Sequence, residues 1–166
     1  MANLFDSVVL APIAIGGTHL DQWVPDGPFH RRFLVAIEKL ARQGLEITHV
    51  LWQQGEADRL IGNPAMYRRV FEDIWLSLRQ YGVYAPIYVA RSSYCGSANT
   101  VVETAQTEVV DLSRRIYAGA DTDTLPAEFR YDGCHLNGKG ADRQAKLWLE
   151  ALAAPRFNAA QQEPPK

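Results

Sequence analysis

The chain has 166 residues, of which 47% are apolar and 22% charged, and its net charge at neutral pH is -2. This length fits one domain with a sizeable core, which we expect over residues 1–154, followed by a disordered tail over 155–166. The absence of a basic run argues against a nucleic-acid partner. The longest apolar run is too short to cross a bilayer, so we predict no membrane segment. The N-terminus lacks the pattern of a secretory signal, and the compartment stays open.

Apolar patterns predict strands and helices in alternation. In chain order, the expected elements are a strand over 7–15, a helix from 28 to 44, a strand over 45–52, a helix from 63 to 82, a strand over 85–90, a helix over 102–116 and a helix over 141–152. Residues 119–130 are expected to be irregular. Pro12 has no N–H to donate to a ladder, so the first strand should lie at a sheet edge.

This alternation predicts an α/β fold, in which a parallel sheet carries helices on both faces. Ligands of such sheets bind beyond the carboxyl ends of the strands. Four polar segments are expected at this rim: Gly16-Gly17-Thr18, Gln54-Gly55-Glu56, the loop around Cys95, and the turn from Asp132 to His135. Their convergence predicts a functional site.

Asp132 and His135 have the spacing of an acid–base pair. A carboxylate that accepts the Nδ1–H of an imidazole fixes its tautomer and leaves Nε2 free to take a proton. Cys95 and Cys134 should approach the same rim, either as a disulfide or as two buried thiols. Two cysteines do not make a zinc site, and we predict no metal and no cofactor.

Three motifs in series resemble the SGNH/GDSL hydrolase superfamily, and most closely its sialate O-acetylesterase-like carbohydrate esterases. They are Ile15-Gly16-Gly17-Thr18 with Trp23, the run from Trp52 to Asp58, and Asp132-Gly133-Cys134-His135. The resemblance covers residues 8–152. It implies a flavodoxin-like three-layer sandwich that hydrolyses acetyl esters of sugars by a Ser-His-Asp mechanism, with an acetylated carbohydrate as partner.

The resemblance also implies roles for individual residues. His135 matches the general base and Asp132 its orienting carboxylate. Gly16, through its N–H, and Gln54, through its side chain, match the oxyanion hole. Gly17, Gly55 and Glu56 match supports of these loops, and Trp23 is a candidate wall of a sugar site.

The nucleophile is the one departure from the family pattern. The family places its serine after a first strand that this chain lacks, so we expect an N-terminally truncated domain with its first strand missing. Ser7 precedes its strand, and Ser92 and Ser93 lie on a different loop. The chain is therefore either an acetylesterase without its serine or a non-catalytic carbohydrate-binding or vestigial module, and whether it is an enzyme stays open.

Each motif also has a purely structural reading. Gly16-Gly17 fits an ordinary tight turn, and Gln54 with Glu56 fits a helix-capping pair on a solvated loop. The missing strand predicts an unpaired sheet edge, through which we expect self-association.

Overall fold

The computed structural model describes residues 6–154, so the predicted tail, 155–166, lies outside the described residues. The helices are α1 (His30–Arg42), α2 (Pro64–Gln80), α3 (Thr100–Glu108) and α4 (Gly138–Ala153), and the strands are β1 (Val50–Trp52), β2 (Ile87–Arg91) and β3 (Ile116–Asp121). Short 3-10 turns connect them; the first, η1, covers Leu20–Trp23. The strands form a parallel sheet in the order β1-β2-β3.

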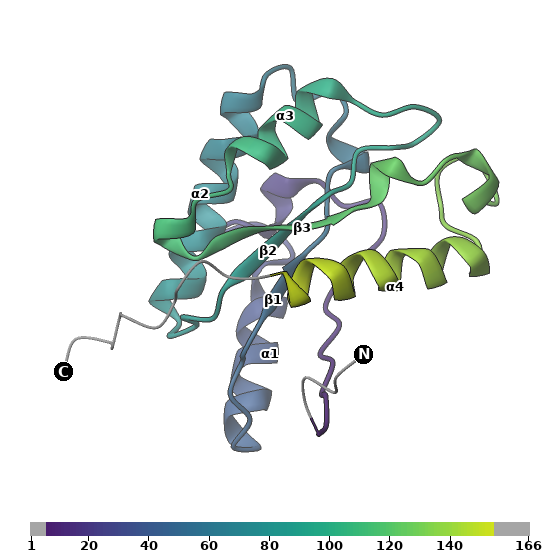
Figure 1. Cartoon of the computed structure of the whole chain (residues 1–166). Coiled ribbons are helices and arrows are strands. Elements are labelled where there is room, and N and C mark those ends of the chain that lie inside the picture. The colour runs from purple at the N-terminus through teal and green to yellow at the C-terminus, as the bar shows by residue number, and fades with distance from the viewer. Residues whose placement is uncertain (1–5, 155–166) are drawn as a thin grey trace.

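Helices cover both faces of this sheet, which confirms the predicted α/β class. α2 and α3 pack on one face and α4 on the other (Figure 1). Alternate residues of β2 serve the two faces: Ile87 and Val89 join the main core, whereas Tyr88 stacks on Tyr117 outside it. α4 lies close to β3, because a Cβ at Gly119 would meet the ring of Trp148 at 2.8 Å.

The main core is rich in aromatic rings. Trp52, at the end of β1, is stacked on Phe33 of α1 and packs edge-on against Phe71 of α2. Trp23 of η1 completes the group, with its ring centroid 6.4 Å from that of Trp52. These contacts bring η1, and the loop that leads into it, against the end of β1.

Local signals in the sequence account for the best-predicted helix. Asn63 caps α2, since its Oδ1 accepts the N–H of Met66 at 3.0 Å, and Pro64 occupies the first turn, where its missing N–H costs nothing. Gly82 follows the helix with φ +77°, a conformation that glycine adopts without strain.

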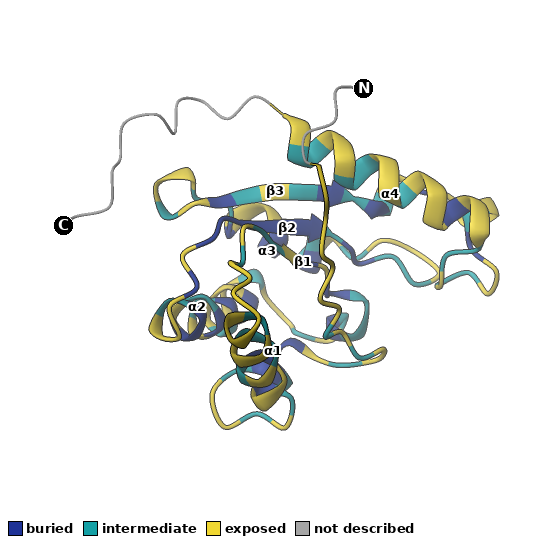
Figure 2. Ribbon diagram, turned by 90° about the horizontal axis from the view of Figure 1, so that it is seen from below, coloured by how far each residue is buried: buried dark blue, intermediate teal, exposed yellow. Residues whose placement is uncertain are grey.

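The strand predicted over 7–15 is wrong. Residues 7–15 have no regular structure, and Val8, Val9 and Leu10 are 68%, 64% and 78% exposed. Figure 2 shows this segment running along the surface. An apolar run becomes a strand only when a neighbour supplies ladder hydrogen bonds, and among the described residues no strand pairs with the outer edge of β1.

Two further regions differ from the prediction: β1 is shorter than expected, and β3 includes residues 119–121, which were expected to be irregular. β1 is only three residues long, because residues 45–49 have no ladder partner. The helix predicted to reach 116 ends at Glu108, and Ile116 opens β3 instead. Val109, Leu112 and Ile116 fit a helical spacing, but Asp111 is extended, with φ -147° and ψ 105°, and so the helix ends before it.

The two residues that follow β1 make contacts on opposite faces of the sheet. Gln53 points toward α4, where its Oε1 accepts hydrogen bonds from Gln144 Nε2 at 2.7 Å and Trp148 Nε1 at 3.3 Å. Gln54 points the other way and contacts Thr18. No helix among residues 6–154 combines the length and the apolar character needed to cross a membrane.

Candidate active site

Asp132 and His135 form a close pair on the turn before α4. Asp132 Oδ2 lies 2.7 Å from His135 Nδ1, while Oδ1 accepts the backbone N–H groups of Cys134 and His135 at 2.9 and 2.7 Å. These bonds, led by the one from the imidazole, lower the pKa of Asp132 from 3.8 to about 2. The carboxylate is therefore ionised at neutral pH and orients the ring.

The ring of His135 is open to solvent on its other side. Its side chain is 66% exposed, and Nε2 forms no hydrogen bond or ion pair with a described residue. The ring stacks on Tyr131, with centroids 5.7 Å apart and planes 17° from parallel. His135 is thus oriented through Nδ1 and accessible through Nε2, which is the arrangement that a general base requires.

The backbone around this pair is a closed turn. Tyr131 N donates to His135 O at 3.0 Å, and Arg130 pairs with Leu136 in an antiparallel bridge. Gly133 has φ +80°, which few other residues adopt. Asn137 then caps α4 by accepting the N–H of Gly140 at 3.0 Å.

A disulfide joins this turn to the loop after β2. Cys95 and Cys134 are bonded, so the disulfide is the alternative that the structure adopts. Beside it, Gly96 N donates to Gly133 O at 2.8 Å. The residue next to His135 is therefore covalently attached to a second segment of the rim.

Gln54, Gly55 and Glu56 lie on a tightly packed loop. Tyr67 Oη and Gln106 Nε2 donate to Gln54 O at 3.1 and 2.9 Å. A Cβ on Gly55 would lie 2.2 Å from Ser92 O, so only glycine fits there. Burial raises the pKa of Tyr67, which keeps its hydroxyl protonated as a donor.

The side chain of Gln54 faces the Gly16-Gly17-Thr18 segment. Its Nε2 donates to Thr18 O at 3.2 Å and to Oδ2 of the buried Asp58. Asp58 also accepts the N–H of Leu20 at 3.0 Å. Gly16 is exposed, and its N–H donates to no described residue.

Trp23 does not wall a surface site, which corrects the prediction made for it. Its side chain is 4% exposed and packs in the core against Phe29 and Phe33. Its Nε1 donates to Thr18 Oγ1 at 3.0 Å, so the indole helps to fix the Gly16-Gly17-Thr18 segment through Thr18. An indole needs a hydrogen-bond partner when buried, and Thr18 supplies it.

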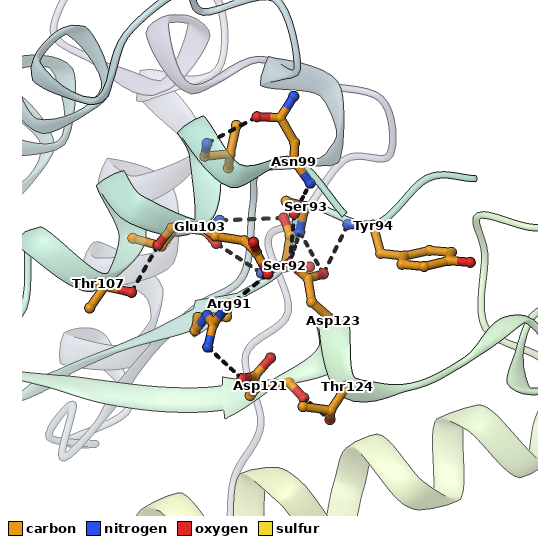
Figure 3. A network of polar contacts seen from close by, with 12 residues as sticks. Arg91, Ser92, Ser93, Tyr94, Asn99, Glu103, Thr107, Asp121, Asp123 and Thr124 are labelled. Atoms are coloured by element: carbon orange, nitrogen blue, oxygen red, sulfur yellow. Dashed lines mark hydrogen bonds and ion pairs between the residues drawn. The ribbon is translucent and has the colours of Figure 1, made fainter. Parts of the chain in front are cut away.

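Ser92 and Ser93 are buried and hydrogen-bonded to carboxylates. Ser92 Oγ donates to Glu56 at 2.6 Å. Ser93 Oγ donates to Asp123 at 2.6 Å (Figure 3). Asp123 also accepts the N–H groups of Ser93 and Tyr94. Neither hydroxyl contacts His135, and both serve to fix the loop after β2.

The rim segments are linked in a row by these contacts. The Gly16-Gly17-Thr18 segment meets Gln54, the loop of Gln54 meets the loop after β2 through Glu56, and that loop meets the His135 turn through the disulfide. Among residues 6–154, no hydrogen bond, ion pair or ring contact joins Gln54 or Gly16 directly to His135, and no group of acidic, histidine or cysteine side chains is suited to a metal ion.

Four side chains of this row were not singled out from the sequence: Asp58, Gln106, Asp123 and Arg130. Each also has a partner that lies far away in the sequence, which no local pattern indicates. Asp58 alone had a signal, because it closes the run that begins at Trp52.

A comparison with protein families gives one finding. A family described as carbohydrate esterase, sialic acid-specific acetylesterase, matches residues 2–153. A search of curated proteins finds no match. The family match covers all three motifs and confirms the resemblance stated from them.

Proposed function

The chain belongs to the sialic acid-specific acetylesterase family of carbohydrate esterases, and from this premise we propose that it binds an O-acetylated sugar and promotes hydrolysis of the acetyl ester with His135 as general base. The reaction adds water across the ester bond and yields acetate and the free sugar hydroxyl. Asp132 keeps the imidazole in the tautomer that leaves Nε2 able to accept a proton.

One observation supports this proposal above the others: the 2.7 Å contact between Asp132 Oδ2 and His135 Nδ1 on an exposed turn. A structural histidine would be expected to bury its ring or to use both nitrogens. Here one nitrogen is held by an ionised carboxylate and the other faces solvent, which suits proton transfer to and from a bound substrate.

Gly16 is the proposed first donor to the developing oxyanion, because its N–H is exposed and unused. Gln54 can supply a second donor only by exchanging a bond, since its Nε2 already donates to Thr18 O and Asp58. The 3.2 Å bond to Thr18 is the longer of the two and is the one we propose to be exchanged. Donors of this kind contribute roughly 3–4 kcal/mol each to stabilising the transition state.

A second function has its own support. No serine among the described residues contacts His135, and Ser92 and Ser93 are engaged with Glu56 and Asp123. The first proposal requires that water activated by His135 attacks the ester slowly, whereas a non-catalytic family member would bind the acetylated sugar without hydrolysing it. This would make the chain chiefly a carbohydrate-binding module.

The test measures binding and hydrolysis on the same samples. The full chain is incubated with an O-acetylated sialic acid; acetate release is followed by NMR, and sugar binding by saturation transfer. We expect binding together with slow release that His135→Ala abolishes while binding persists. Release that is unchanged in His135→Ala would refute the role of the base, and binding without release above background would favour the second function.

A serine-directed fluorophosphonate provides an independent check. We expect no labelled serine, because Ser92 and Ser93 are 1% and 0% exposed. A labelled peptide, identified by mass spectrometry, would locate a nucleophile and contradict the proposal that water attacks.

A further inference from the structure

Arg130 is a buried cation without an acidic partner. Its side chain is 8% exposed, and no carboxylate of the described residues forms an ion pair with it. Burying an unpaired charge is costly unless hydrogen bonds replace the lost water. The bonds that Arg130 makes should therefore be specific.

Backbone carbonyl oxygens take the place of a counter-ion. Nη1 donates to the oxygens of Tyr94 and Cys134, Nη2 donates to Thr122 O at 2.9 Å, and Nε donates to Leu125 O at 3.3 Å. The ring of Tyr94 covers the guanidinium at 4.3 Å. One side chain thus holds together the loop after β2, the segment after β3 and the His135 turn.

The contact with Cys134 is the one that bears on the site. Cys134 lies between Gly133 and His135, and Asp132 Oδ1 accepts the N–H groups of both Cys134 and His135. The disulfide and the bond from Gly96 N to Gly133 O tie the turn to the loop after β2, but they do not by themselves set its orientation relative to the segment after β3. A planar guanidinium with donors in fixed directions restrains that orientation.

We propose that Arg130 is a positioning residue, which holds the Asp132–His135 turn in the orientation where Nδ1 meets the carboxylate. The inference builds on the proposed function, but the geometry that it concerns can be measured without any substrate. Its readout is the tautomer of the His135 ring.

The experiment uses the full chain labelled with nitrogen-15. The side-chain nitrogen shifts of neutral histidine distinguish an Nδ1–H ring from an Nε2–H ring, and the signal of His135 is assigned by its loss in His135→Gln. We expect the Nδ1–H form in the wild type, a mixture in Arg130→Met, and an intermediate result in Arg130→Lys, because an ammonium keeps the charge but cannot serve four carbonyl oxygens in one plane.

Arg59→Met is the matched control. Arg59 also binds the loop after β2, donating to Ser93 O at 3.2 Å and to Ser97 Oγ at 3.1 Å, and forms no hydrogen bond or ion pair with the His135 turn. Its loss should leave the tautomer unchanged. If Arg59→Met also changes the tautomer of His135, the effect comes from a general loosening of the loop after β2, and the proposal is overturned.

The remaining outcomes are also decisive. A wild-type tautomer in both Arg130 variants would refute the role of Arg130, and if Arg130→Met fails to fold, Arg130→Lys decides alone. An Nε2–H ring in the wild type would instead remove the Asp132–His135 pair on which the proposed function depends. Ordinary acetate release with an Nδ1–H ring in every variant would contradict only the positioning role.

Discussion

The His135 turn and the segment 7–15 are both exposed, but they are held in opposite ways. The turn is polar, and a disulfide, a buried arginine and three bonds to one carboxylate fix it. The segment is apolar, and its hydrogen bonds to described residues are two: Thr18 Oγ1 donates to Ile15 O, and Arg32 Nε donates to Ile13 O at 2.9 Å. Specific polar partners therefore fix the turn at the surface, whereas the apolar segment has irregular backbone and reaches the core only through Ile13 and Ile15.

Removing the disulfide, which fixes the His135 turn, should cause the largest loss of stability. Cys95→Ser with Cys134→Ser opens a loop whose ends are 39 residues apart, and loop entropy predicts a loss of about 4 kcal/mol in the free energy of unfolding. Urea unfolding of the double variant measures it, and the wild type in reductant should agree. A loss below about 1 kcal/mol would mean that the hydrogen bonds alone fix the turn.

Glycine substitutions probe how tightly the rim is packed. Gly55→Ala places a methyl group 2.2 Å from Ser92 O, so the backbone must shift, at a cost of roughly 1–3 kcal/mol. Gly16→Ala is the matched control, because a Cβ there meets nothing within 4 Å. Thermal unfolding compares the two, and equal midpoints would contradict the close approach.

A pair of valine truncations compares the segment with the core. Val102→Ala removes a fully buried side chain and should cost about 2 kcal/mol, whereas Val9→Ala, at a residue 64% exposed, should change stability by less than about 0.5 kcal/mol. Urea unfolding measures both. A large loss in Val9→Ala would show that the segment is packed in solution, and sedimentation of the same samples tests the predicted self-association.

The smallest effect is the pH dependence that Asp132 contributes. Its pKa is lowered from 3.8 to about 2, so its ionised form stabilises the folded chain above pH 4, and this contribution is lost as the pH falls from about 4 to about 2. The stability difference between wild type and Asp132→Asn should shrink over that interval. A difference that stays constant down to pH 2 would show that the charge of Asp132 is not involved.

The predictions that succeeded depend on short-range signals. Asn63-Pro64 opens a helix and Asp132 precedes His135 by three residues, and both patterns act within one turn of chain. The strand predicted over 7–15 failed because a strand depends on a partner that its own residues do not specify.

The supports of the site could not be predicted for a related reason. Arg130 meets Tyr94 across 36 positions, and Gln106 meets Gln54 across 52. Neither residue belongs to a periodic or spaced pattern, so only the folded chain reveals its role. The oxyanion residues were named through family resemblance, whereas the Asp132–His135 pair was indicated by its spacing as well, and the catalytic roles of all of them remain predictions.

The two glutamines after β1 impose a constraint on how this chain can vary. Because successive side chains of an extended segment point to opposite sides, Gln53 reaches Gln144 and Trp148 while Gln54 reaches Thr18. Inserting or deleting one residue here would exchange the two, turning each amide toward the wrong layer. Length changes should therefore be tolerated far less at this strand end than in the longer surface connections, even where composition is preserved.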